Sequence, residues 1–263
     1  MKKYLVIGNP IDHSLSPELH NYWLKTKNIK AIYDKMKTTN DQIKDLVLQI
    51  KDEKINGLNI TVPFKQKVIP YLDQLSEEAR KTQSVNTVVF KDNKVIGHNT
   101  DIEGFEYSLK SKSIDLKDKK IFVIGAGGVV PSIIYALNKM KVSNIAISNR
   151  TRSKAENLKK LFEKLEIIDW GKVPEFDMII NATSIGLNEQ DKINLDLPKV
   201  ENKLFYDVIY NPVETQFLKF GKKHGNMVLN GKMMFIYQAF FAFKLWHNLE
   251  PEINNEVLKL LGQ

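Results

Sequence analysis

A glycine-rich turn near the middle of the chain constrains the fold more than any other feature. Gly125-Ala126-Gly127-Gly128 follows the apolar residues 121–124 of a predicted buried strand (120–125) and precedes a helical stretch from about 129 to 140. Glycines let the backbone turn tightly and approach a pyrophosphate, and a helix N-terminus offers it free N–H groups. A glycine turn without a ligand is the competing interpretation. The residues that we expect at the phosphates are Gly125, Ala126, Gly127, Gly128 and Val129.

The segments after this turn alternate between β-rich and helical patterns. We expect strands at Asn144–Ser148, Met178–Ala182, Leu204–Val208 and Met227–Leu229. Strands that alternate with helices form parallel sheets, so this order is typical of a Rossmann-type nucleotide-binding domain.

The residues after the strand expected at Asn144–Ser148 favour one cofactor. NAD sites usually have Asp or Glu here, bonded to the ribose 2′-hydroxyl. This chain instead has Asn149-Arg150-Thr151, followed by Arg152 and Lys154. An arginine can stack on the adenine and bind a 2′-phosphate, which a carboxylate would repel. We therefore predict NADP, held by Asn149, Arg150, Thr151 and Lys154. Alternatively, these are surface residues, and Thr151 or Ser153 caps the next helix.

The first hundred residues predict a second α/β domain. We expect strands at 4–8, 31–35 and 58–62, and a hairpin of 87–90 and 94–97 around Asp92-Asn93. The expected helices are 17–26, 41–52, 65–72, 76–82 and a linking helix of about 101–112. Helices at 233–246 and 251–261 should pack back on this domain. We thus predict an N-terminal α/β substrate domain (1–101, joined by about 238–263) and a C-terminal Rossmann NADP-binding domain (102–237).

Composition narrows the classes of function. The chain has 263 residues, 43% of them hydrophobic and 27% charged, which is typical of a globular protein. The lack of cysteine excludes disulfides, zinc–thiolate sites and thiol nucleophiles. Asn9-Pro10 ends the first apolar run too early for a signal peptide, and the stretch 233–245 is too short to span a bilayer. We expect a cytoplasmic protein without a membrane partner.

The formal net charge of +8 raises the question of a nucleic-acid partner. The lysines, however, are interleaved with acidic residues, which favours a solvated surface that attracts small anions. No His/Asp/Glu spacing typical of a metal site is present. We therefore expect a small-molecule substrate, no nucleic acid and no metal, and leave a homodimer open.

Four segments of the first domain carry more polar groups than folding requires: 13–17, 59–65, 85–87 and 98–101. Ser14 and Ser16 can both donate to a carboxylate, although helix capping explains Ser16 equally well. Lys65 is expected at a helix start, where a cation is unfavourable next to the positive end of the helix dipole unless a nearby anion or a functional role compensates. Asp101 could cap the linking helix.

In combination, these segments resemble shikimate dehydrogenases over nearly the whole chain. The matching motifs are Gly8-Asn9-Pro10-Ile11, Ser14-Leu15-Ser16-Pro17-Glu18-Leu19-His20-Asn21, Asn59-Ile60-Thr61-Val62-Pro63-Phe64-Lys65, Val85-Asn86-Thr87, Asn99-Thr100-Asp101, the glycine turn, Asn149-Arg150-Thr151, Asn181-Ala182-Thr183-Ser184-Ile185-Gly186, Asp207-Val208-Ile209-Tyr210-Asn211-Pro212 with Thr215, and Met234 with Gln238. So many matches in one order are highly specific.

The resemblance implies NADPH-dependent reduction of 3-dehydroshikimate to shikimate, a step of chorismate and aromatic amino acid biosynthesis. It implies Lys65 and Asp101 as the catalytic pair. The implied substrate site is Ser14, Ser16, Thr61, Lys65, Asn86, Asp101, Tyr210 and Gln238, and the implied nicotinamide-side residues are Thr183, Val208 and Gly231. The departures are Ile102-Glu103, which adds a carboxylate near the site, Val130 and Pro131 after the glycines, and Met233. They bear on cofactor affinity more than on activity.

Hydride transfer to a ring carbonyl builds negative charge on oxygen, which a lysine can protonate or stabilise. Two alternatives remain. A quinate/shikimate dehydrogenase would need room for a further ring hydroxyl near Ser14, Ser16 and Tyr210. A non-catalytic ligand-binding homologue, associated with nucleic acid through the positive charge, would not need Lys65 and Asp101.

Overall fold

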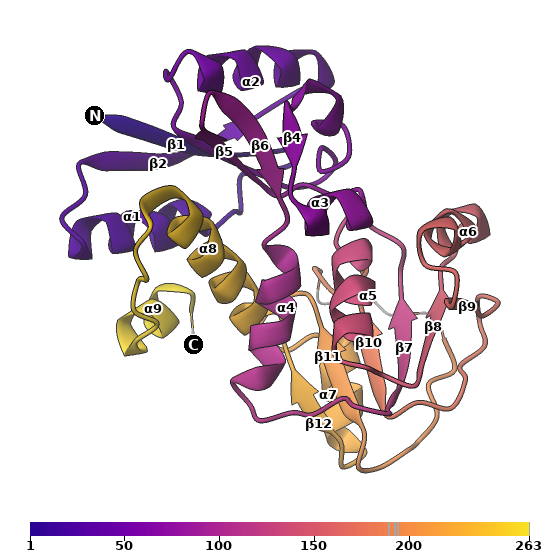
Figure 1. Cartoon of the computed structure of the whole chain (residues 1–263). Coiled ribbons are helices and arrows are strands. Elements are labelled where there is room, and N and C mark those ends of the chain that lie inside the picture. The colour runs from indigo at the N-terminus through magenta and orange to yellow at the C-terminus, as the bar shows by residue number, and fades with distance from the viewer. Residues whose placement is uncertain (189, 192, 194, 263) are drawn as a thin grey trace. The chain divides into compact units, whose positions relative to one another are not determined.

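The computed structural model describes residues 1–188, 190–191, 193 and 195–262, and the chain divides into two compact units. Unit 1 comprises Met1–Gly104 and Ile236–Gln263, and unit 2 comprises Phe105–Phe235. The unit boundaries fall within α4 (Asp101–Lys110) and α8 (Lys232–His247) (Figure 1).

Unit 1 is built on a mixed sheet. Its strands are β1 (Lys2–Gly8), β2 (Ala31–Lys37), β3 (Gly57–Ile60), β4 (Gln74–Leu75), β5 (Thr87–Lys91) and β6 (Lys94–His98), in the order β2-β1-β3-β5-β6-β4. Strands β1, β2 and β3 are parallel, whereas β5 is antiparallel to β3 and β6. Asp92 and Asn93 have φ angles of 51° and 57°, as a two-residue hairpin turn requires, so the predicted hairpin is confirmed.

Helices cover both faces of this sheet (Figure 1). They are α1 (Ser16–Thr26), α2 (Ile43–Lys51), α3 (Glu77–Thr82), α9 (Asn255–Leu260), the C-terminal part of α8, and the 3-10 turns η1 (Asn40–Gln42) and η2 (Ile69–Tyr71). Ile43, Leu46, Val47 and Ile50 recur at helical spacing and bury one face of α2 in the core with residues of β1, β3, β5 and β6.

The other face of the sheet is rich in aromatic rings from α1 and α8. Tyr4 of β1 lies 4.9 Å from Trp246, measured between ring centroids, and Trp246 donates its indole N–H to the Val88 carbonyl at 3.0 Å. A Cβ on Gly57 would come within 2.3 Å of the Trp246 nitrogen, so glycine permits this close approach. The predicted return of the C-terminal helices to the first domain is therefore confirmed.

Two helix predictions in unit 1 are wrong. The segment 65–72 forms turns and the short η2 instead of an α-helix, because Pro70 lacks an N–H and disfavours helical geometry at Ile69. Lys65 therefore does not oppose a helix dipole. The last helix begins at Asn255 rather than at 251, because the Asn254 side chain caps it by accepting from the Val257 N–H at 3.1 Å.

Unit 2 has the predicted Rossmann architecture. Its strands are β7 (Lys120–Ile124), β8 (Asn144–Ser148), β9 (Glu166–Ile167), β10 (Met178–Asn181), β11 (Leu204–Asp207) and β12 (Met227–Leu229), all parallel in the order β12-β11-β10-β7-β8-β9. The connecting helices include α5 (Val130–Lys139), α6 (Arg152–Leu161) and α7 (Gln216–Lys223). Strand order reverses beside β7, which is where such sheets bind ligands at the carboxyl ends of their strands.

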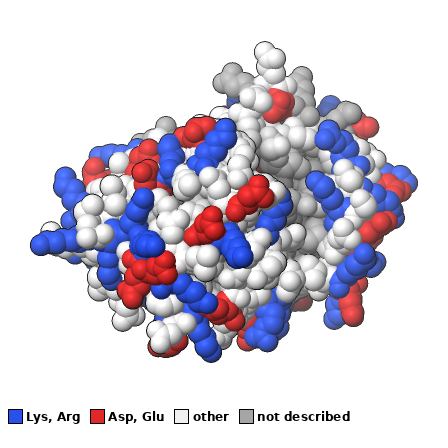
Figure 2. Space-filling model, turned by 90° about the horizontal axis from the view of Figure 1, so that it is seen from above, with Lys and Arg blue, Asp and Glu red and all other residues white. Residues whose placement is uncertain are grey.

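The described part of the chain has no helix that is long and apolar enough to cross a membrane. It also holds no group of three or more acidic or histidine side chains placed to bind a metal ion. Lysines and acidic residues are interleaved on the face in Figure 2, as expected for a solvated lysine-rich surface.

Candidate active site

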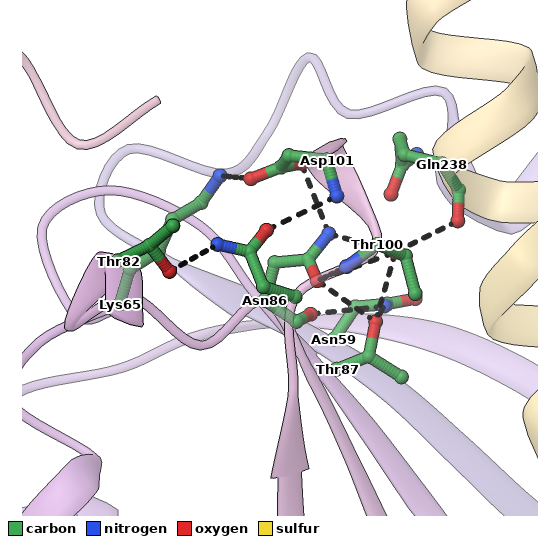
Figure 3. Close-up of polar contacts among 9 residues, drawn as sticks. Asn59, Lys65, Thr82, Asn86, Thr87, Thr100, Asp101 and Gln238 are labelled. Atoms are coloured by element: carbon green, nitrogen blue, oxygen red, sulfur yellow. Dashed lines mark hydrogen bonds and ion pairs between the residues drawn. The ribbon is translucent and has the colours of Figure 1, made fainter. Parts of the chain in front are cut away.

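Lys65 and Asp101 form a buried ion pair in unit 1 (Figure 3). Lys65 lies in the turn after β3, and Asp101 is the first residue of α4. Their side chains are only 10% and 8% exposed, and the ammonium donates to one carboxylate oxygen of Asp101. The structure therefore brings together the two predicted catalytic residues, which are 36 positions apart in the chain.

Asn86 holds the second oxygen of Asp101. Its amide donates to that oxygen at 2.9 Å and to the Thr100 hydroxyl at 3.0 Å, while its own oxygen accepts from the Thr100 N–H at 2.7 Å. The Thr100 hydroxyl in turn donates to the Gln238 carbonyl of α8 at 2.9 Å. Four predicted site residues thus belong to one polar network (Figure 3): Lys65, Asn86, Asp101 and, through its backbone carbonyl, Gln238.

This network extends through residues to which the sequence assigned no role. The Asn59 amide donates to the Asn86 carbonyl and to the Thr87 hydroxyl, both at 3.0 Å, and the Asn59 oxygen accepts from the Tyr33 hydroxyl at 2.6 Å. Asn59, Thr87 and Tyr33 are all buried. Asn59 and Thr87 stand in the matched motifs, which was the available signal, whereas nothing local marks Tyr33.

The two serines lie together at the start of α1. Ser14 is half-buried, and its hydroxyl accepts from the Ser16 N–H at 3.3 Å. The capping interpretation of Ser16 is wrong, because Leu15 is the N-cap residue and Ser16 already belongs to the helix. Thr61 follows β3 and is half-buried, and its N–H donates to the Ile7 carbonyl at 2.9 Å.

Asp101 does not cap α4 either. It is the first helical residue, and both of its carboxylate oxygens are used by Lys65 and Asn86. An acidic residue in the first turn is favourable next to the positive end of the helix dipole, and this also holds for Glu103.

The glycine turn of unit 2 has the shape that a pyrophosphate needs. Gly125 has a φ of 111°, and a Cβ there would lie 2.7 Å from the Ala182 carbonyl oxygen, so only glycine fits. Gly127 is exposed, and Val129 is the N-cap residue of α5. Val130 is buried, and Pro131 in the first turn of α5 needs no N–H partner. Val130 and Pro131, which depart from the family pattern, therefore leave the glycine turn and the N-terminus of α5, the phosphate cradle, intact.

Arg150 is exposed directly after β8, and its described surroundings include no ion-pair partner for it or for Lys154. Arg152, in contrast, pairs with Glu156 at 3.1 Å and with Asp169. Thr151 occupies the N-cap position of α6 without a side-chain cap bond, and Ser153 lies inside the helix, so the capping alternative is not supported. The Asn149 amide donates to the Thr151 carbonyl at 2.8 Å.

The predicted nicotinamide-side residues also lie in unit 2. Thr183 donates its hydroxyl to Asn181 at 2.7 Å, and the Gly231 N–H donates to the Ile209 carbonyl at 3.0 Å. A Cβ on Gly231 would overlap the Val208 carbonyl oxygen at 2.0 Å. Tyr210 is half-buried and stacks on Phe235, with ring centroids 4.6 Å apart.

Comparison with known proteins identifies the family. Residues 6–88 match the family model described as shikimate dehydrogenase substrate binding domain, and residues 108–208 match the model described as shikimate / quinate 5-dehydrogenase. The chain is 58% identical to a shikimate dehydrogenase (NADP(+)) of Pelagibacter ubique over 261 residues, which is 99% of this chain and 98% of the relative. The chain belongs to the shikimate dehydrogenase family.

Solved structures of this family have the same fold. A shikimate dehydrogenase from Aquifex aeolicus superposes with a TM-score of 0.90 at 35% identity, over 100% of this chain and 98% of that one. A shikimate 5-dehydrogenase from Thermus thermophilus, in complex with NADP(H) and shikimate, has a TM-score of 0.87 at 31% identity, over 96% and 95% of the two chains. The predicted family and fold class are therefore confirmed.

Proposed function

We propose that this chain catalyses the reversible NADPH-dependent reduction of 3-dehydroshikimate to shikimate, a step of aromatic amino acid biosynthesis. The observation that carries the proposal is the buried Lys65–Asp101 pair held by Asn86, in a chain 58% identical to an NADP-dependent shikimate dehydrogenase. We further propose that unit 1 binds the substrate and unit 2 binds the cofactor.

The residues of unit 2 fit NADP. The cradle at Gly125 and the N-terminus of α5 suit a pyrophosphate, and the exposed Arg150 suits a 2′-phosphate. In the reductive direction the bound cofactor supplies a hydride to the ring carbonyl. We assign Asn149, Thr151 and Lys154 to the 2′-phosphate end, and Thr183, Val208 and Gly231 to the nicotinamide end.

In unit 1, Asp101 holds the Lys65 ammonium in place, and the other N–H donors of the ammonium remain available to the substrate. The ammonium can then donate a proton to the carbonyl oxygen as negative charge builds there, or stabilise that charge. Asn86 keeps the carboxylate oriented. Ser14, Ser16 and Thr61 bind the substrate carboxylate and ring in this proposal, and Gln238 also contacts the substrate. Tyr210 of unit 2 is proposed as a further substrate-binding residue.

A turnover assay tests the proposal. Purified protein should oxidise NADPH rapidly only when 3-dehydroshikimate is present. A rate equal to the rate without that substrate would refute the proposal, and DNA retention at low salt would then favour a non-catalytic, nucleic-acid-associated homologue.

The role of Lys65 is tested by Lys65→Ala. We expect kcat to fall by about 10²- to 10⁴-fold with little change in KM. Lys67→Ala is the matched control, because the Lys67 ammonium is exposed and contacts Asn40 at 2.8 Å. A large rise in KM with kcat preserved would make Lys65 a binding residue only.

A broader quinate/shikimate dehydrogenase is the second candidate, and the description of the family model for residues 108–208 favours keeping it. Comparison of shikimate and quinate oxidation with NADP and with NAD separates the two. We expect shikimate with NADP to give the highest kcat/KM.

We also propose that the chain acts in the cytoplasm and forms a homodimer. A fluorescent fusion in cells tests the first statement, and sedimentation of the purified protein tests the second.

A further inference from the structure

One motif of this chain has no role in the function proposed above. Asn181, Asp207 and Thr215 are buried in unit 2 and come from the end of β10, the end of β11 and the residue before α7. They lie beside the loops that carry the proposed nicotinamide-side residues Thr183 and Val208.

Asp207 is the centre of this cluster. Its carboxylate accepts hydrogen bonds from the Thr215 hydroxyl at 2.7 Å, from the Ile209 N–H at 3.0 Å, and from the Asn181 amide, which lies 3.1 Å from both oxygens. The residue is fully buried. Among the described side chains, no cation forms an ion pair with it.

Burial of this carboxylate is unfavourable by itself. It raises the pKa of Asp207 to about 6, although the hydrogen bonds from Thr215, Ile209 and Asn181 oppose the shift. Folding alone would be served by an apolar residue at the end of β11, because a buried carboxylate without a cation is costly. A perturbed carboxylate at the carboxyl end of a Rossmann strand indicates a functional demand.

The hydrogen bonds connect three separate backbone segments. The Asn181 oxygen accepts from the Thr183 N–H at 3.1 Å and from its hydroxyl at 2.7 Å, which fixes the loop after β10. The bond from the Ile209 N–H to Asp207 fixes the loop after β11. The Ile209 carbonyl then accepts from Gly231 at 3.0 Å, which ties the segment before α8 to the same loop.

The three segments tied in this way carry Thr183, Val208 and Gly231. Gly231 lies so close to the Val208 carbonyl that no side chain fits between them, so a small displacement of either segment changes the surface that both present. A misplacement of about 1 Å near a reacting group can lower a rate by about 10²-fold.

We propose that Asp207 is a positioning residue: its buried carboxylate, through Asn181, Thr215 and Ile209, holds the segments of Thr183, Val208 and Gly231 in the geometry that receives the nicotinamide end of NADP. The proposal rests on the proposed function, because it concerns the cofactor site assigned above. The proposal concerns only the nicotinamide end of the cofactor site. The hydrogen bonds described for Asp207, Asn181 and Thr215 do not include Arg150, which is assigned to the 2′-phosphate end.

The test compares NADP⁺ with adenosine 2′,5′-bisphosphate, a fragment with the 2′-phosphate and adenine but without nicotinamide. We expect Asp207→Ala to lower kcat for 3-dehydroshikimate about tenfold or more and to weaken NADP⁺ binding, while fragment affinity stays within about twofold. A purely structural role would weaken both ligands together.

Two pairs of variants make the test independent of folding. Asp207→Asn should retain clearly more activity than Asp207→Ala, because its amide oxygen can still accept from the Ile209 N–H and the Asn181 amide, and its nitrogen can donate to the Thr215 hydroxyl. Thr215→Val should lose activity with fragment affinity intact, and Thr215→Ser should restore it. Tyr206→Phe is the control, because it removes a buried 2.9 Å hydrogen bond to Ser108 from the same strand. It should leave kcat and both affinities unchanged.

Wild-type kcat in both Asp207→Ala and Thr215→Val would overturn the proposal, as would a parallel loss of fragment affinity. If the wild-type protein does not turn over 3-dehydroshikimate, the proposed function fails, but the two binding measurements still decide the role of Asp207.

Discussion

The ion pair between Lys65 and Asp101 allows a quantitative prediction from its surroundings. If Lys65 is replaced by Met, Asp101 keeps the Asn86 amide at 2.9 Å and its place in the first turn of α4. If Asp101 is replaced by Asn, the Lys65 ammonium loses the one charged partner described for it and remains about 90% buried. The two single substitutions should therefore have unequal effects.

We expect Asp101→Asn to lower the free energy of unfolding by about 3–5 kcal/mol, because it leaves an uncompensated buried charge. Lys65→Met should cost about 1–3 kcal/mol, because the remaining carboxylate is still hydrogen-bonded. In the double variant no charge is left unpaired, so its loss should be smaller than the sum by about 2 kcal/mol or more.

Urea unfolding at pH 7, followed by tryptophan fluorescence, measures these differences. Trp23 and Trp246 lie in unit 1, so two of the three tryptophans report on the unit that contains the pair. Lys67→Met serves as the control for loss of a lysine at the surface. Additive losses in the double variant, or a greater loss for Lys65→Met than for Asp101→Asn, would refute the reasoning.

Three further predictions concern other parts of the chain. Arg150→Ala should raise KM for NADPH about tenfold or more in steady-state assays and leave KM for NADH unchanged, whereas Arg152→Ala, whose partners are Glu156 and Asp169, should change neither. Burial lowers the pKa of His20 to about 3. Below pH 6.5 the unfolded chain therefore binds a proton at His20 that the folded chain does not bind, so the free energy of unfolding falls as the pH drops from 6.5 toward 3. His20→Phe, which keeps the stack on Tyr33, should therefore lose about 2 kcal/mol less than wild type between pH 7 and pH 5 in urea unfolding, and an equal loss would contradict this. Tyr33→Phe should lower stability by about 1–3 kcal/mol, because it leaves the Asn59 oxygen without the 2.6 Å bond, and an unchanged urea midpoint would argue against that contact.

Much of the fold could be predicted because its signals are local. The apolar run before Gly125, the glycines and the following helix determine a nucleotide-binding turn within about 20 residues. Asp92-Asn93 determines the hairpin in the same way, because only a few residue types adopt two successive positive φ angles. Arg150 predicts NADP for a similar reason, because its position after β8 follows from chain order alone.

The site of unit 1 could be predicted only as a set of candidates. Ser16 and Asp101 each stand at an expected helix start, so helix capping explained them as well as a role in the active site. The sequence also predicted Lys65 on a helix that does not form. Burial of Lys65 depends on Asp101, which is 36 residues away, so no local pattern contains it.

Only the tertiary structure connects the residues that support these candidates. Tyr33 of β2 contacts Asn59 of β3 across β1, because their partners on β1, Tyr4 and Val6, are two residues apart and so lie on the same face of the sheet. Asn59 contacts Thr87 because β3 pairs with β5 in antiparallel register. Asp207 contacts Asn181 because β10 and β11 are neighbours and pair these two residues. The sequence by itself determined the turns, the periodic helices and the family. Strand order and register decided which buried polar groups meet, because such groups must find partners across the sheet once water is excluded.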